Sequence, residues 1–180
     1  MLLKSKKSKF ETVSTIIKYY TSILCLLFIL SSCGIYSFQQ GSIPPEVQSI
    51  SIANIYNESG GGPSNLSQNF TEKLKSYYQQ NSRLSIATTN GDWQLEGKIV
   101  SYQVMPIAVQ GAKGAANRLT MRVQIKFINN NDPKANFDQA FSFFSDYPAE
   151  QTLTLVENEL IETITNQIVF DIFTKTTSNW

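Results

Sequence analysis

The stretch RLTMRVQIKFINN, which runs from Arg118 to Asn130, decides the fold of this chain because its side chains alternate in polarity. Successive side chains of a β-strand point to opposite faces of the sheet, so this alternation predicts a strand with one buried face and one face in water. The side chains of the predicted buried face are Leu119, Met121, Val123, Ile125 and Phe127. Those of the predicted wet face are Arg118, Thr120, Arg122, Gln124 and Lys126. The fold therefore needs a second layer that covers one face of a sheet.

The segments on both sides of this stretch also favour strands. NFDQAFSFFSDY, residues 136–147, alternates more loosely, and the NNNDPK turn joins it to the central strand as an antiparallel hairpin. WQLEGKIVSYQVMPIAV, residues 93–109, predicts a long strand in which Gly97 and Pro106 mark bulges or bends. VQSISIANIY predicts an earlier strand, and RLSIATT a short one. Phe143 and Phe144 cannot both face the core of a regular strand, which favours a protein contact surface beside Phe141.

Two other segments have the period of amphipathic helices. In residues 65–81, Leu66, Phe70 and Leu74 recur at steps of four and are followed by two tyrosines. In the last segment, Thr154 and Glu157 match the T-x-x-E capping box at the start of a helix. The apolar stripe of that helix is Val156, Leu160, Ile164, Ile168 and Ile172. The order strand, helix, several strands, helix predicts an α+β two-layer domain with both helices on one face of a mostly antiparallel sheet.

The N-terminus has the features of an export signal. Lysines are spread from Lys4 to Lys18, and 12 mostly apolar residues follow, from Tyr19 to Leu30. A membrane-spanning helix needs about 20 apolar residues, so this segment is too short to be a permanent anchor. Leu30-Ser31-Ser32-Cys33 resembles the bacterial lipobox, which implies cleavage before Cys33 and attachment of acyl chains such as palmitate to that residue. An ordinary secretory signal with a chance cysteine near the cut is the alternative.

This interpretation divides the chain into three parts. We expect a lipoprotein signal peptide at residues 1–32, a lipidated cysteine and linker at residues 33–46, and a single domain at residues 47–180. Cys25 would leave with the signal, so Cys33 would have no cysteine to pair with. Several acyl chains give stable anchoring where one chain does not, so we expect Cys33 to tether the protein to a membrane. Tyr36 and Phe38 would either dock the linker on the domain or lie at the membrane surface.

Composition argues against most enzyme and nucleic-acid classes. The 180 residues include no His and two Cys, which removes His-based triads and Cys/His zinc patterns. The signal would take five Lys and one Glu, leaving ten basic and 13 acidic side chains in the mature chain. That mild net negative charge holds the domain neither to nucleic acid nor to an anionic membrane. This composition leaves open only enzymes built from carboxylates, Ser, Lys or Tyr; we expect no enzyme activity, no cofactor and no metal.

Two short motifs are candidate sites of chemistry. GGGPSN lies between a predicted strand and a predicted helix, as phosphate loops do, but it lacks the G-x-x-x-x-G-K-[ST] pattern and is better interpreted as a turn. Asp92 and Glu96 are four residues apart at the start of a strand, where a period of two would place them on one face. Paired carboxylates can perform acid–base catalysis, but solvation at a strand start is the more usual role of such residues.

A basic row is the strongest candidate binding feature. Arg118, Arg122 and Lys126 project from one face of the central strand at steps of four residues, roughly 13 Å apart. The row is either a solvated sheet face or a strip that contacts phosphates or an acidic partner surface.

The order of these features resembles the LPS-assembly lipoprotein family LptE, in its branch of short lipoproteins that begin CGIYSF. The resemblance is carried by LSSCGIY, VQSISIANI, LSQNFTEKLKSYY, LEGKIVSYQV, RLTMRVQIKF, FSFFSDY, ENELIETITNQIVFDIF and the final Asn179-Trp180. It covers essentially the whole predicted mature chain. It implies two helices packed on a mixed four-stranded sheet and a role without catalysis.

The resemblance also implies a location and partners. Such proteins are anchored in the outer membrane, face the periplasm and sit inside the β-barrel LptD, where they plug it, help its assembly and assist lipopolysaccharide transport to the surface. PAEQTLTLVEN, the segment before the last helix, has no Lys or Arg, which favours barrel binding over direct lipopolysaccharide binding. Gly34 stands where inner-membrane lipoproteins of some bacteria have Asp, which favours the outer membrane. The alternative is a periplasmic lipoprotein that binds a small ligand or serves another envelope machine as a pilot-like subunit.

Overall fold

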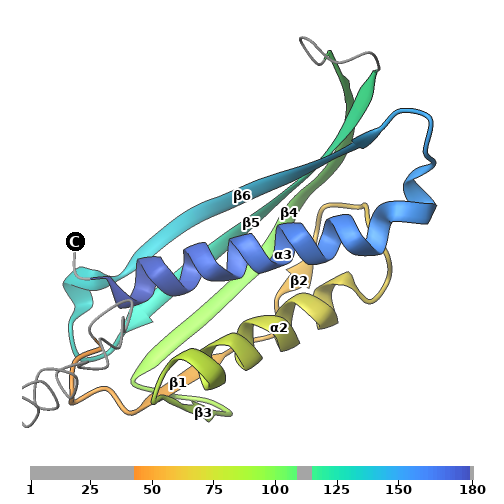
Figure 1. The fold of residues 1–180 in the computed structure, drawn as a ribbon. Helices are drawn as coiled ribbons and strands as arrows, with labels where there is room; N and C mark the ends of the chain where they lie inside the picture. The colour runs from red at the N-terminus through yellow and green to blue at the C-terminus, as the bar shows by residue number, and fades with distance from the viewer. Residues whose placement is uncertain (1–42, 109–114, 179–180) are drawn as a thin grey trace, which may run out of the picture. The chain divides into compact units, whose positions relative to one another are not determined.

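The computed structural model describes residues 43–108 and 115–178, and its elements are labelled in Figure 1. The strands are β1 (Ser49–Ile52), β2 (Tyr56–Asn57), β3 (Ser85–Ala87), β4 (Trp93–Ile107), β5 (Ala116–Asn129) and β6 (Phe137–Pro148). The helices are α2 (Leu66–Asn81), the short 3-10 helix η1 (Pro133–Ala135) and α3 (Leu153–Thr177). The predicted signal peptide, Cys33, Tyr36 and Phe38 lie outside the described residues.

The strands form one mixed sheet in the order β3-β1-β4-β5-β6, with β2 also paired to β4. The pairs of β1 and β2 are parallel, whereas β4, β5 and β6 form an antiparallel meander. Figure 1 shows α2 and α3 side by side on one face of this sheet. The predicted α+β two-layer class is therefore confirmed. The sheet has six strands rather than four, because the two- and three-residue strands β2 and β3 are added to it.

The core lies between the sheet and the two helices. The five apolar side chains predicted to face inward from β5 are all at most 2% exposed, so the alternation of the opening stretch is confirmed. On α2, the predicted Leu66, Phe70 and Leu74 are buried, and Tyr78 packs edge-on against Phe173 of α3 with ring centroids 5.1 Å apart. Neither described helix is both long and apolar enough to cross a lipid bilayer.

The irregularity in β4 is not where the sequence placed it. Gly97 and Pro106 pair regularly with Ile125 and Asn117, and the register shifts instead between Ile99 and Ser101. Gly97 has a different purpose, because a Cβ there would lie 2.5 Å from the carbonyl oxygen of Gln124. The glycine thus permits close packing of β4 on β5, while the bulge reverses which β4 side chains face the helices.

The predicted capping box is also wrong. Helix α3 begins at Leu153, so Thr152 is its N-cap residue, and that side chain forms no capping hydrogen bond. Thr154 lies within the first turn, and Glu157 accepts a hydrogen bond from the hydroxyl of Tyr102 at 2.6 Å. The T-x-x-E pattern therefore matched by chance, and Glu157 instead ties the helix to β4.

Candidate partner-binding face of the sheet

The sheet face that points away from α2 and α3 carries the predicted basic row. Arg118, Arg122 and Lys126 all project from β5 on this face, opposite the buried side chains of the same strand. The structure thus brings the three predicted residues onto one surface, which we call the outer face. Their cationic groups differ in what surrounds them, and this decides what each can bind.

Arg118 is engaged within the sheet. Its Nε donates to Oδ1 of Asp146 at 2.7 Å and its Nη2 donates to Oδ2 at 2.9 Å, which is the bidentate geometry of a strong pair. The guanidinium also lies 3.6 Å from the ring centroid of Phe144. The hydrogen bonds from Arg118 hold the pKa of Asp146 below its usual range. Arg118 is therefore already neutralised by its neighbour on β6.

Lys126 also has an acidic neighbour, though a weaker one. Its Nζ lies 3.7 Å from Oε2 of Glu96 on β4, and both side chains are more than half exposed. A second exposed pair joins Lys98 to Glu58 at 2.8 Å. Exposed pairs of this kind are worth about 0–1 kcal/mol and exchange readily for other partners. This end of the outer face therefore carries side chains of both charges, close to one another.

Arg122 is the open cation of the row. Among residues 43–108 and 115–178, no carboxylate lies within 4.0 Å of its guanidinium. It stands opposite Ser101 on β4 and Ser142 on β6, whose short side chains leave the guanidinium exposed. Arg122 is therefore the member of the predicted row whose charge is available to a partner.

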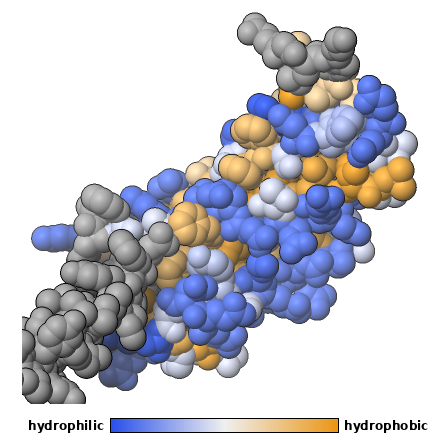
Figure 2. Space-filling model, in the orientation of Figure 1, coloured by the Kyte–Doolittle hydropathy of each residue, from blue (hydrophilic) through white to orange (hydrophobic). Residues whose placement is uncertain are grey.

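Apolar side chains gather at one end of the sheet. On the outer face, Met105 is 52% exposed and Phe144 is 43% exposed, and they flank Arg118. Figure 2 views the helix side and shows apolar surface where α3 begins, near the same end, and Leu155 there is 81% exposed. Interfaces are enriched in Arg, Met and aromatic side chains, so this end has the composition of a contact surface.

The sequence did not predict Met105, and the reason is the bulge in β4. Trp93, Leu95 and Ile99 face the core, so a period of two carried forward would turn Met105 inward as well. The register shift after Ile99 reverses the pattern, which turns Tyr102 inward and Met105 outward. Phe144 was recognised because two adjacent phenylalanines cannot both be buried.

The two weighed carboxylates have structural partners. One oxygen of Asp92 accepts three hydrogen bonds at 2.9 Å, from the backbone N–H groups of Gln48 and Ser49 and from the Ser49 hydroxyl. These bonds lower the pKa of Asp92 and join the start of β1 to the start of β4. Glu96 is the partner of Lys126. Within the part of the chain that the structure describes, no group of three acidic, His or Cys side chains is placed to hold a metal.

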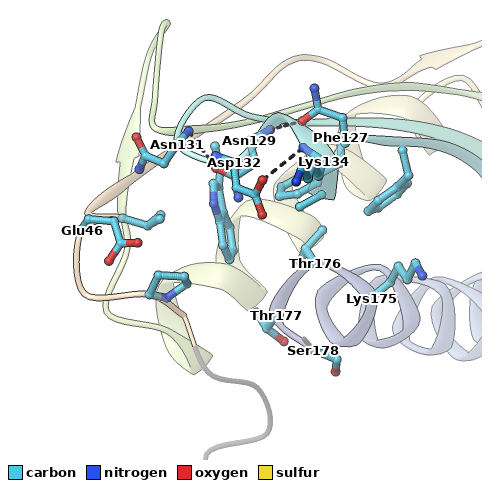
Figure 3. A pocket seen from close by; sticks show the side chains of 16 residues that line it. Glu46, Phe127, Asn129, Asn131, Asp132, Lys134, Lys175, Thr176, Thr177 and Ser178 are labelled. Atoms are coloured by element: carbon cyan, nitrogen blue, oxygen red, sulfur yellow. Dashed lines mark hydrogen bonds between the residues drawn. The ribbon is translucent and has the colours of Figure 1, made fainter. Parts of the chain in front are cut away.

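A pocket of about 340 Å³ lies at the opposite end of the sheet, beside η1 and the end of α3 (Figure 3). Three of its polar side chains, those of Asn129, Asp132 and Asn136, stabilise the turn itself. Asn129 accepts the N–H groups of Asn131 and Asp132 at 2.9 and 3.1 Å, and Asp132 accepts that of Lys134 at 3.2 Å. Trp93 also lines the pocket, and its buried indole N–H has no hydrogen-bond partner among the described residues.

Comparison with known proteins adds a family to this geometry. The family LptE, described as lipopolysaccharide-assembly, matches residues 47–176. No curated protein matches the sequence. This match spans every described strand and almost all of α3.

Solved structures resemble the chain only distantly. A hypothetical protein from Chlamydia trachomatis has 7% identity and a TM-score of 0.49, covering 72% of this chain and 98% of that chain. A protein from Xanthomonas campestris has 10% identity and a TM-score of 0.48, covering 76% and 90%. A minor lipoprotein from Acinetobacter baumannii has 14% identity and a TM-score of 0.46, covering 70% and 89%. At TM-scores below 0.5, these likenesses support no conclusion about binding.

Proposed function

The chain belongs to the LptE family of lipopolysaccharide assembly, and from that membership we propose that it is a non-enzymatic lipoprotein of the outer membrane. In this proposal it faces the periplasm and associates with the LptD β-barrel, as plug and assembly partner, while lipopolysaccharide passes to the cell surface. The observation that carries the proposal is the family match over residues 47–176, which is nearly the whole of the predicted domain. The lipobox-like sequence ending at Cys33 supports the lipid anchor.

The outer face supports a protein partner more than a phosphate ligand. A strip that binds phosphates uses several unpaired cations, but Arg118 is held by Asp146, and Lys126 lies near Glu96. Arg122, Met105 and Phe144 together offer one open charge beside apolar surface. This mixture fits the core of a protein interface, where Arg and aromatic side chains contribute most of the binding energy. We therefore assign the outer face to the barrel.

The proposal is tested by purifying the tagged protein from envelopes and measuring the recovery of LptD. Arg122→Glu reverses the open charge without breaking an ion pair, and we expect it to weaken barrel association about tenfold, which corresponds to about 1.4 kcal/mol. Lys73→Glu is the matched control, because it makes the same charge change on an exposed position of α2.

Each outcome of this purification has a defined meaning. Recovery of no outer-membrane barrel by the unmodified protein would overturn the proposed function. Equal recovery of LptD by both variants would show that Arg122 is not part of the contact with the barrel. Depletion of the protein should reduce lipopolysaccharide at the cell surface, whereas an intact surface with a secretion defect would favour a pilot-like role.

A second candidate function is binding of a small ligand, and the pocket at Trp93 is the observation that favours it. A buried N–H without a partner is costly, and a ligand that displaces the atoms covering the Trp93 N–H and brings an acceptor to it would satisfy it. A ligand screen that monitors thermal stability tests this candidate, with Trp93→Phe as the control that removes the donor. Ligands that stabilise both forms equally would not be bound through Trp93.

A further inference from the structure

The two edges of the sheet differ greatly in length. At one edge, β3 has three residues, which is a common way of blunting an edge strand. At the other edge, β6 has 12 residues and pairs with β5 on one side only. Among the described residues no strand lies beside β6 on its other side, and Figure 1 shows α3 over the face of β6 rather than beside its edge.

The backbone groups of this free edge can be assigned from the ladder. The N–H of Ala149 donates to the carbonyl of Ala115 at 3.1 Å, next to the pair Ala116–Pro148. Antiparallel pairs alternate between bonded and non-bonded, so the odd-numbered residues of β6 bond to β5. The residues whose N–H and C=O groups point to the free edge are Asp138, Ala140, Ser142, Phe144 and Asp146. All five are exposed.

The edge lacks most of the devices that prevent strand pairing. Its register with β5 runs from Phe137 to Pro148 without a bulge, and its single proline is the last residue. It carries no Lys or Arg, and its charges are Asp138 and Asp146, eight residues apart. A long, regular edge of this kind is a template for an added strand.

We propose that the β6 edge binds an extended segment of another protein by strand addition. The segment would carry two basic side chains eight residues apart, opposite Asp138 and Asp146, and would share carboxylates that already accept the Gln124 amide and the Arg118 guanidinium from β5. β5 shows this complementarity on the other side of the same strand, because Arg118 stands opposite Asp146 and Lys126 stands opposite Asp138. The inference does not depend on the barrel being the partner.

Charge argues against a second copy of the chain as the occupant. Two β6 strands paired antiparallel about Ser142 would place Asp138 of each copy directly opposite Asp146 of the other. Parallel pairing in register would place each aspartate opposite itself. Like charges directly opposite destabilise a strand pair, so both of these pairings of a second copy are disfavoured, whereas a basic segment of a different protein meets opposite charge.

The test uses the full chain in mild detergent and a peptide with the sequence of residues 116–128, acetylated and amidated at its ends. We expect the peptide to slow hydrogen exchange of the edge-facing amides at least tenfold. Ala140→Pro removes one edge N–H that β5 does not use, so it should weaken peptide binding at least tenfold while the fold survives. Ala140→Thr is the matched control, because it keeps the N–H on the same face, and it should change binding less than threefold.

The remaining outcomes also decide the proposal. A peptide with glutamate in place of both Arg118 and Lys126, the two side chains that stand opposite Asp146 and Asp138, should bind at least tenfold more weakly. Equal binding by the Pro and Thr variants, or no protection along the edge, would overturn strand addition. Protection without peptide, together with a dimer mass in sedimentation, would show that a second copy covers the edge and would overturn the heterologous partner. If Ala140→Pro fails to fold, exchange in the unmodified chain decides.

Discussion

At position 97 the sheet leaves no room for a side chain. A Cβ on Gly97 would lie 2.5 Å from the Gln124 carbonyl oxygen and 2.7 Å from Cδ1 of Ile125. Gly97→Ala should therefore lower the free energy of unfolding by at least about 2 kcal/mol, because β4 and β5 must separate. Gly60→Ala is the control, since it has a φ of +72° but open space around it, and it should cost about 1 kcal/mol. Urea unfolding measures both, and equal losses would contradict the packing argument.

Tyr78 is a buried titratable group that links stability to alkaline pH. Its side chain is fully buried, and its hydroxyl donates to Oγ1 of Thr176 at 2.5 Å, because the Thr176 hydroxyl donates to the Phe173 carbonyl. Burial raises the pKa of Tyr78 well above its ordinary value. The folded state thus favours the neutral phenol, and the unfolded state loses that proton from about pH 10.

Because the pKa is raised on folding, the stability contributed by Tyr78 is fully present below about pH 10 and is lost as pH rises above it. Tyr78→Phe should make the fall in unfolding free energy shallower by about 1.4 kcal/mol per pH unit above pH 11. Part of the fall should remain, because burial also raises the pKa of Tyr102. Urea unfolding between pH 8 and 12 measures this slope. Identical slopes for both proteins would show that Tyr78 ionises without unfolding the chain.

At the scale of an element, the start of α3 is an uncapped helix end. Thr152 has the extended backbone of an N-cap residue but forms no capping bond. Thr152→Asp should raise the free energy of unfolding by about 0.5–1 kcal/mol, because a carboxylate accepts a first-turn N–H and complements the helix dipole. Thr154→Ala should change stability by less than about 0.5 kcal/mol. A loss of about 1 kcal/mol of unfolding free energy in Thr154→Ala would instead support the capping-box interpretation.

The elements also show which parts of the fold can be predicted from sequence. The predictions of helix α2 and strand β5 were correct. Each element buries one face, so its apolar residues recur with the period of that structure. The position of the β4 bulge was predicted wrongly. Gly and Pro are the residue types that usually mark a bulge, so the prediction fell on Gly97 and Pro106, whereas the bulge lies at Val100. On the outer face, sequence placed all three basic side chains correctly. It could not show that Arg118 is neutralised, because Asp146 is brought to it by strand pairing.

At the scale of the whole molecule, the point where the chain enters the described domain is fixed by hydrogen bonds. Arg83 donates to the carbonyls of Ile43 and Pro44 at 3.0 and 2.6 Å, which fixes where the chain enters the domain. The ten residue-to-residue steps from Cys33 to Ile43 span at most about 36 Å when extended. A lipid on Cys33 would therefore hold the domain close to the membrane, where the proposed barrel partner also lies.

This arrangement predicts that loss of the two cysteines has different effects. Cys33→Ser should abolish incorporation of labelled palmitate and release the domain from the membrane fraction, because no acyl chain remains to anchor it. Cys25→Ser is the matched control and should keep both label and membrane attachment, because Cys25 leaves with the signal peptide in this proposal. The measurement is labelling followed by membrane fractionation. Label retained in Cys33→Ser, or lost equally from both variants, would contradict the lipobox interpretation, whereas release without loss of barrel association would show that the domain alone carries the contact.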